Sequence, residues 1–81
     1  MIKIKLKCFS QVKYALGKDE FAMELKRGTT SVELEKMIRE KANGLLDGIS
    51  LRLALNMKYI PEGVVLNDGD EVAFIPPVQG G

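Results

Sequence analysis

The sequence predicts an α+β fold, in which a mixed sheet of about five strands carries one main amphipathic helix on one face. Three observations lead to this: alternating apolar residues near both ends of the chain, one capped helical segment between them, and turn signals that separate short strands. With 81 residues, 46% of them hydrophobic, the chain can form one compact domain and is too short for two.

The first two predicted strands lie in the N-terminal third of the chain. In residues 2–8, apolar side chains alternate with three lysines, so one face is buried and the other exposed. Phe9 continues the lysine face, and residues 10–17 are long enough for a turn or two of helix. Residues 21–25 alternate again, so we expect them to form a hairpin-like pair with the first strand.

The main helix is expected to begin at Thr30. Glu33 stands three residues later, which is the spacing of a capping box. Side chains then recur at three- and four-residue steps and form one apolar stripe that must cover the sheet, and Asn43-Gly44 marks its end. The residues of this stripe are Leu34, Met37, Ile38, Lys41 and Leu45.

Three further strands are predicted in the C-terminal half: residues 51–55, a short strand at Tyr59 and Ile60, and residues 71–75 after a turn. This order of elements is that of a ubiquitin-like β-grasp fold, whose first and last strands lie side by side. We therefore expect a β-grasp domain over residues 1–75 and a flexible C-terminal tail over residues 76–81.

Composition excludes several classes of function. A net charge of +1 provides no overall field for nucleic acid or an anionic membrane. Without histidine, Ser-His or Cys-His catalysis and an imidazole metal site are impossible. A single cysteine and the lack of a signal peptide or a long apolar segment indicate a cytoplasmic location. We expect no metal, no bound cofactor, no nucleic acid and no membrane among its ligands.

Two side-chain candidates for chemistry have simpler explanations. Cys8 could carry a persulfide, but it is in phase with the apolar face of the first strand, so core packing is favoured. Asp68 and Asp70 flank Gly69 like a fragment of a calcium loop, but the other ligands are missing, so a turn is favoured. The C-terminal tail is the remaining candidate. Its two prolines favour an extended backbone, and its two glycines have no side chains, so the end of the tail has a small cross-section. Its six residues reach at most about 20 Å.

Residues 68–81, Asp-Gly-Asp-Glu-Val-Ala-Phe-Ile-Pro-Pro-Val-Gln-Gly-Gly, resemble the C-terminal signature of a known family, the small subunits of molybdopterin synthase. In that family a Gly-Asp-Glu-Val strand leads into Pro-Pro-Val-x-Gly-Gly. The Pro-Pro pair is the specific part of the match, and the resemblance extends essentially over the whole chain. Tyr14 departs from it, because many members carry an acidic residue there.

The resemblance implies a sulfur carrier rather than an enzyme in its own right. An E1-like enzyme would adenylate the Gly81 carboxylate with ATP, and a sulfur donor would convert it to a thiocarboxylate. The tail would then enter the large synthase subunit, which catalyses sulfur transfer to cyclic pyranopterin monophosphate, in a heterotetramer of two small and two large subunits. The tail residues implied are Pro76, Pro77, Val78, Gln79, Gly80 and Gly81.

A docking surface for the partner is expected beside this tail. Phe9, Ala73 and Ile75 share the outer face of the predicted sheet with the three N-terminal lysines, which predicts an apolar patch rimmed by positive charge. By position, the partner surface of the resembled family falls on Phe9, Lys13, Tyr59 and Ile75. Three alternatives remain open: a sulfur carrier for thiamine or cysteine synthesis, a ubiquitin-like modifier that forms isopeptide bonds, and a plain interaction domain.

Overall fold

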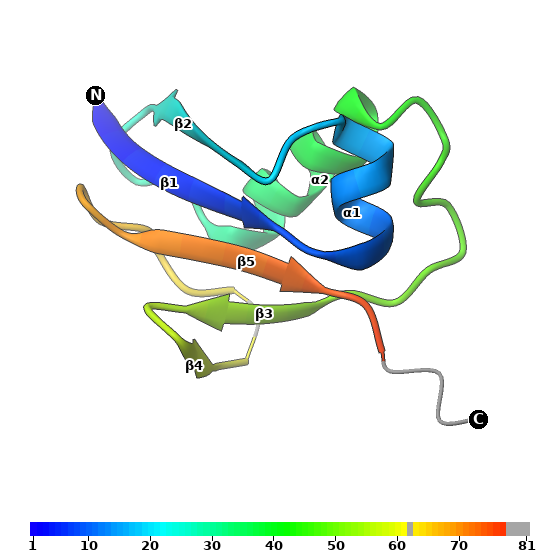
Figure 1. Ribbon diagram of the computed structural model, residues 1–81. Helices are drawn as coiled ribbons and strands as arrows, with labels where there is room; N and C mark the ends of the chain where they lie inside the picture. The colour runs from blue at the N-terminus through cyan, green and yellow to red at the C-terminus, as the bar shows by residue number, and fades with distance from the viewer. Residues whose placement is uncertain (62, 78–81) are drawn as a thin grey trace.

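The computed structural model describes residues 1–61 and 63–77. It has two layers, a twisted five-stranded sheet and two helices that cover one face of it (Figure 1), so the predicted α+β fold is confirmed. Within the described residues, neither helix is long and apolar enough to cross a membrane. The elements are β1 (Ile2–Cys8), α1 (Ser10–Leu16), β2 (Glu20–Leu25), α2 (Ser31–Lys41), β3 (Arg52–Leu55), β4 (Lys58–Tyr59) and β5 (Glu71–Ile75).

The sheet has the strand order β2-β1-β5-β3-β4, with the first and last strands adjacent at its centre, as predicted. β1 and β5 are parallel, and all other neighbours are antiparallel. Cys8 pairs with Phe74, so β1 and β5 end at the same edge of the sheet. The residues that follow them, including Phe9, therefore lie next to the point where the chain leaves β5.

The apolar alternation of β1 and β5 builds the core. Ile2, Ile4, Leu6 and Cys8 are each at most 4% exposed, and they face the helices while the lysines between them face outward. β5 contributes its inward residues in the same way. The buried core cluster is Ile2, Ile4, Leu6, Cys8, Val12, Leu25, Leu34, Ile38, Ala42, Leu46, Leu51, Leu53, Leu66, Val72 and Phe74.

Helix α2 begins as predicted, with both halves of the capping box formed. The Thr30 hydroxyl accepts a hydrogen bond from the Glu33 backbone N–H at 3.2 Å, and the Glu33 carboxylate accepts one from the Thr30 N–H at 2.9 Å. Two backbone donors that would otherwise be unsatisfied at the start of the helix are thereby paired.

The predicted apolar stripe is right at its start and wrong at its end. Leu34 and Ile38 are fully buried, whereas Leu45 is 66% exposed and the next residue, Leu46, is buried instead. The reason is that α2 ends at Lys41 and the chain continues in turns, so the helical spacing no longer determines which side chain points inward. Met37, at 37% exposure, lies at the edge of the stripe.

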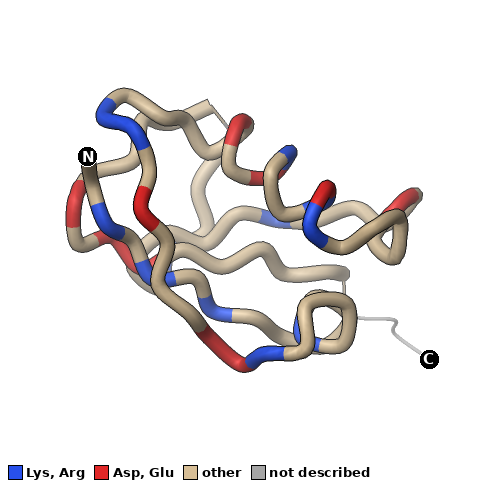
Figure 2. Tube along the Cα trace, turned by 90° about the horizontal axis from the view of Figure 1, so that it is seen from above, with Lys and Arg blue, Asp and Glu red and all other residues tan. Residues whose placement is uncertain are grey.

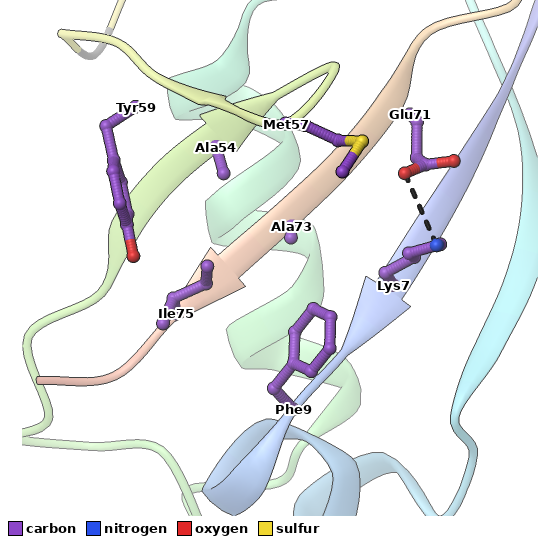
Figure 3. Close-up of a pocket in the computed structure, with 8 residues that line it drawn as sticks. All are labelled: Lys7, Phe9, Ala54, Met57, Tyr59, Glu71, Ala73 and Ile75. Atoms are coloured by element: carbon purple, nitrogen blue, oxygen red, sulfur yellow. Dashed lines mark ion pairs between the residues drawn. The ribbon is translucent and has the colours of Figure 1, made fainter. Parts of the chain in front are cut away.

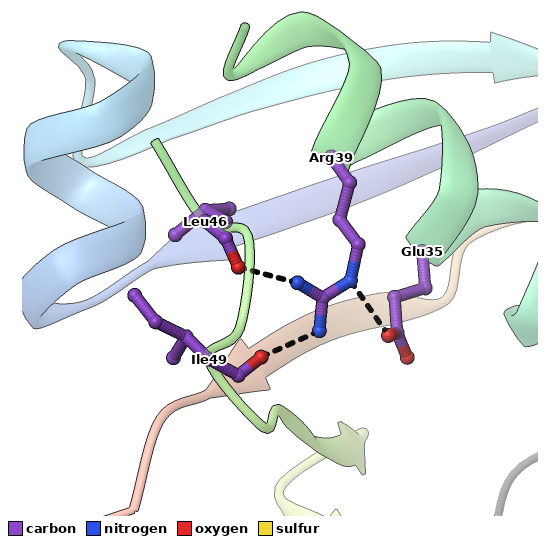
Figure 4. Close-up of polar contacts among 4 residues, drawn as sticks. All are labelled: Glu35, Arg39, Leu46 and Ile49. Carbon is purple, nitrogen blue, oxygen red and sulfur yellow. Dashed lines mark hydrogen bonds and ion pairs between the residues drawn. The ribbon is translucent and has the colours of Figure 1, made fainter. Parts of the chain in front are cut away.

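Arg39 holds this irregular segment against the helix (Figure 4). Its Nε donates to the Glu35 carboxylate at 3.0 Å, and its two terminal nitrogens donate to the backbone carbonyls of Leu46 at 2.6 Å and Ile49 at 2.7 Å. The guanidinium thus satisfies two carbonyls that no regular element pairs, and it fixes the chain direction that buries Leu46.

The short strand β4 lies one residue earlier than predicted, at Lys58–Tyr59 instead of Tyr59 and Ile60. The cause is a tight connection: Ala54 pairs with Tyr59 and Leu55 with Lys58, which leaves only Asn56 and Met57 for the turn. Two-residue hairpin turns fix the register of the strands that they join.

Candidate functional site

A groove of about 260 Å³ lies on the face of the sheet opposite the helices (Figure 3). Its walls come from the end of β1, the β3–β4 hairpin and β5, three segments far apart in the sequence. The lining residues are Lys7, Phe9, Ala54, Met57, Tyr59, Glu71, Ala73 and Ile75.

The hollow exists because small and large side chains are placed in a particular order on this face. Ala54 and Ala73 are direct partners in the β3–β5 register, so the floor consists of two methyl groups side by side. Phe9, Tyr59 and Ile75 rise around this floor (Figure 3). A sheet face whose side chains were all of similar size would have no such depression.

Three of the four residues predicted to bind a partner meet at this groove, namely Phe9, Tyr59 and Ile75. Phe9 is 47% exposed and Tyr59 57% exposed, so their apolar surface is open to solvent. Large apolar side chains grouped on one exposed face are typical of interaction sites. That these residues bind a partner stays a prediction.

Lys13, the fourth, is not part of the groove. It lies on α1, and its ammonium pairs with the Asp19 carboxylate at 2.7 Å, which raises the pKa of Lys13 above its usual value. It lines a neighbouring hollow that shares Lys7 and Phe9 with the groove. A role for Lys13 in partner binding also stays a prediction.

The rim of the groove has mixed charge, so the predicted positive rim is wrong. The Lys7 ammonium lies 3.4 Å from the Glu71 carboxylate (Figure 3), and Arg52 stacks on the ring of Tyr59 at 4.5 Å. Basic and acidic positions are interspersed over the whole trace (Figure 2). The sequence-based prediction counted the lysines of β1 alone. It was wrong because Glu71, the ion-pair partner of Lys7, lies on β5, which is distant in the sequence.

Met57 is a groove residue that the sequence analysis missed. It is 89% exposed, and both turn residues have left-handed backbone conformations, with φ of 50° at Asn56 and 71° at Met57. A left-handed conformation costs a residue other than glycine about 1–2 kcal/mol. The sequence did contain a signal for this turn, because only two residues separate the alternating runs of the two strands. Such two-residue turns commonly have Asn in the first position and Gly in the second, where this chain has Met.

Hydrogen bonds from Asn56 hold this turn against β5. The Asn56 side-chain amide donates to the Asp70 carboxylate at 3.1 Å, and its side-chain carbonyl accepts from the Glu71 N–H at 2.9 Å. The Asn56 N–H donates to the Glu71 carbonyl at 2.8 Å. The hairpin is therefore anchored where β5 begins, and Met57 has a defined position above the groove.

The other end of the groove borders the start of the predicted tail. β5 ends at Ile75, Pro76 is buried and Pro77 is exposed, so the chain is still packed against the domain one residue after the strand. Val78, Gln79, Gly80 and Gly81 lie outside the described residues, and the flexibility predicted for residues 76–81 stays a prediction.

The turn between Asn67 and Asp70 has the role that was favoured for it. Asp68 accepts a hydrogen bond from the Lys3 N–H at 2.7 Å, and Asp70 accepts one from the Asn67 N–H at 2.7 Å. Both carboxylates thus stabilise backbone. Over residues 1–61 and 63–77, no group of three or more Cys, Asp or Glu side chains could hold a metal ion.

Comparison with known proteins agrees with this geometry. A model of the ThiS family matches residues 6–81. The chain is 36% identical over 83 residues to a molybdopterin synthase sulfur carrier subunit of Mycobacterium tuberculosis, with all of both chains covered. A solved structure, a putative molybdopterin converting factor subunit 1 from Pyrococcus furiosus, has a TM-score of 0.85 at 26% identity and covers 96% of this chain and 100% of its own.

A second solved structure contains a partner. The complex of subunits 1 and 2 of the molybdopterin-converting factor from Helicobacter pylori matches with a TM-score of 0.69 at 24% identity, covering 99% of this chain and 100% of the matched one. At that identity the match supports the fold alone.

The β-grasp fold and the family match define the class: the chain belongs to the ThiS family of ubiquitin-like sulfur carriers. Within that class it belongs to the sulfur carrier subunits of molybdopterin synthase, which serve molybdenum cofactor biosynthesis and are not themselves catalytic. The family and function that the C-terminal signature indicated are confirmed.

Cys8 is expected to be chemically inert in the folded protein. It is 3% exposed, and burial, together with the carboxylate of Asp19, raises the pKa of its thiol. Since the thiolate is the reactive form, alkylation by iodoacetamide at mildly alkaline pH should be at least about tenfold slower in the native protein than in urea. The raised pKa also means that stability falls as the pH rises above the thiol's unfolded-state pKa. Equal alkylation rates in the two states would contradict the packing role and reopen a persulfide role.

Proposed function

We propose that the Gly81 carboxylate carries the sulfur as a thiocarboxylate, and that the groove holds the large synthase subunit while the tail delivers it. The single observation that carries this proposal is the position of the groove, which borders Ile75, the last residue of β5 before the tail. A partner that binds at this groove would therefore meet the tail at a defined starting point, next to Ile75.

The length of the tail fits a protein in which the groove binds the partner and the tail delivers the sulfur. Six residues, from 76 to 81, span at most about 20 Å. A tail of this length reaches a buried site only if the domain docks close to the entrance of that site. The two prolines limit the conformations of its first part, and Gly80 and Gly81 need the least room in a narrow channel.

Gly81 requires activation by another protein, because a carboxylate does not exchange oxygen for sulfur unaided. The partner proposed for this step is an E1-like enzyme that uses ATP to form an acyl adenylate at Gly81 and release pyrophosphate. Sulfur from a donor then displaces AMP. The described part of the chain carries no group for this chemistry, and ATP is proposed as a substrate of the activating enzyme rather than a ligand here.

The large subunit is the proposed acceptor of the loaded tail, and there sulfur would pass to cyclic pyranopterin monophosphate. The relatives with which the chain shares 36% identity are named as subunits of molybdopterin synthase, and such a name supports a pairing with a second subunit. A heterotetramer of two small and two large subunits, in the cytoplasm, is the proposed assembly. Phe9, Tyr59 and Ile75 are the proposed contacts in the groove, and Lys13 a contact at its border.

The carrier role predicts a change in intact mass. After incubation with ATP, the E1-like enzyme and a sulfur source, the mass should rise by the difference between one sulfur and one oxygen atom, and deletion of Gly81 should abolish the rise. The Cys8→Ala variant is the control and should gain the same mass, because its thiol is buried. A mass gain lost with Cys8 and kept without Gly81 would contradict the proposal.

The docking role predicts that Ile75→Asp weakens binding of the large subunit at least about tenfold, because a charge would be desolvated in an apolar contact. The fold should survive, since residue 75 lies on the outer face opposite Arg52. Val32→Asp is the matched control: Val32 is 50% exposed in the first turn of α2, where an acidic residue is tolerated. Calorimetry with the purified partner measures both, and equal affinities of the two variants would remove Ile75 from the interface.

A further inference from the structure

We propose that Met57 is a specificity-determining contact for the large subunit, a thioether arm that enters an apolar pocket of that partner. This inference rests on the proposed docking function of the groove and extends it to a residue that neither the fold nor the family match assigns. It is carried by four observations on Met57 and its turn.

The first observation is exposure without an internal role. Met57 is 89% exposed, the most exposed of the large apolar side chains in the described residues, and it is not among the residues that pack on the core. Its side chain therefore contributes little to the stability of the isolated domain. An exposed methionine that lies in a groove with other large apolar side chains, rather than alone, is typical of an interaction site.

The second observation is backbone strain. Met57 has a φ of 71°, a left-handed conformation that glycine adopts without steric cost and that glycine commonly supplies at the second position of such turns. The strain is tolerated although the side chain is 89% exposed and is not among those that pack on the core. Strained residues that the fold nevertheless holds in place are concentrated at binding sites.

The third observation is that the turn is anchored. Asn56 makes one backbone and two side-chain hydrogen bonds to Asp70 and Glu71, so the position of the turn relative to β5 is set. An exposed side chain on a fixed turn loses less freedom on binding than one on a loose loop. The anchored turn therefore presents Met57 ready for contact.

The fourth observation is continuity with the groove. Met57 lines it together with Phe9 and Ile75, from the opposite wall (Figure 3). The groove borders the tail at Ile75, so a partner that receives the tail and fills the groove would also meet Met57. Because the two charged residues that line the groove, Lys7 and Glu71, are paired with each other, an apolar partner surface fits there best.

The test compares two variants at Met57 with a matched variant elsewhere, using the full chain and the purified large subunit. Met57→Gly removes the side chain and the strain, so it should raise the melting temperature of the isolated protein by a few degrees and weaken binding about five- to tenfold. Met57→Gln keeps the length of the side chain but not its apolar character, and should also weaken binding. Met37→Gln makes the same change on α2, on the other face of the sheet, and should leave the affinity within about twofold.

Opposite effects of Met57→Gly on stability and affinity would support the inference, because a merely structural role cannot raise one and lower the other. Unchanged affinity in both Met57 variants, with Ile75→Asp still weakening the complex, would overturn the role of Met57 and leave the groove as the docking site. If Ile75→Asp also had no effect, the docking proposal itself would fail, and this inference with it. A Met57→Gly protein that is less stable would show that Met57 supports the fold, and would overturn the inference too.

Discussion

The parallel pairing of β1 with β5 is the contact on which the rest of the structure depends. It brings the two ends of the chain together at the centre of the sheet, and Cys8 opposite Phe74 sets the register. Since side chains alternate along a strand, these two strands supply the core on one face and the groove on the other. A slip by one residue would exchange the two faces, so the same register specifies both the fold and the proposed docking surface.

This arrangement separates stability from function within one small domain. The helices and the inward side chains form the core, and the outward face carries the groove that is proposed to bind a partner. Small residues at Ala54 and Ala73 make the floor, while the hairpin and the end of β1 make the walls. The chain leaves β5 at this groove, so a partner bound there receives the tail from a defined starting point. With the sulfur carried at Gly81, as proposed, the domain itself needs neither a reactive side chain nor a deep cleft.

Most of the fold could be predicted because its signals are local. The alternation over residues 2–8 and the Thr30–Glu33 capping box determined their elements directly. The predictions that were wrong depend on contacts between distant residues: Leu46 is buried in place of Leu45 where Arg39 fixes the chain, and Lys7 is neutralised by Glu71. Phe9 and Ile75 could be assigned to the groove from strand periodicity, whereas Met57 could not, because its placement follows from a turn anchored to β5.

An amide NMR titration of the protein with the large subunit would show directly which face of the sheet the partner contacts. If the β1–β5 register creates a docking face beside the tail, the perturbed amides should cluster on Phe9, Ala54, Ala73 and Ile75, while those on the exposed face of α2 stay unchanged. Perturbations centred on α2, with the outer face of the sheet unaffected, would rule out the groove as the docking surface, and the tail would then be delivered without it.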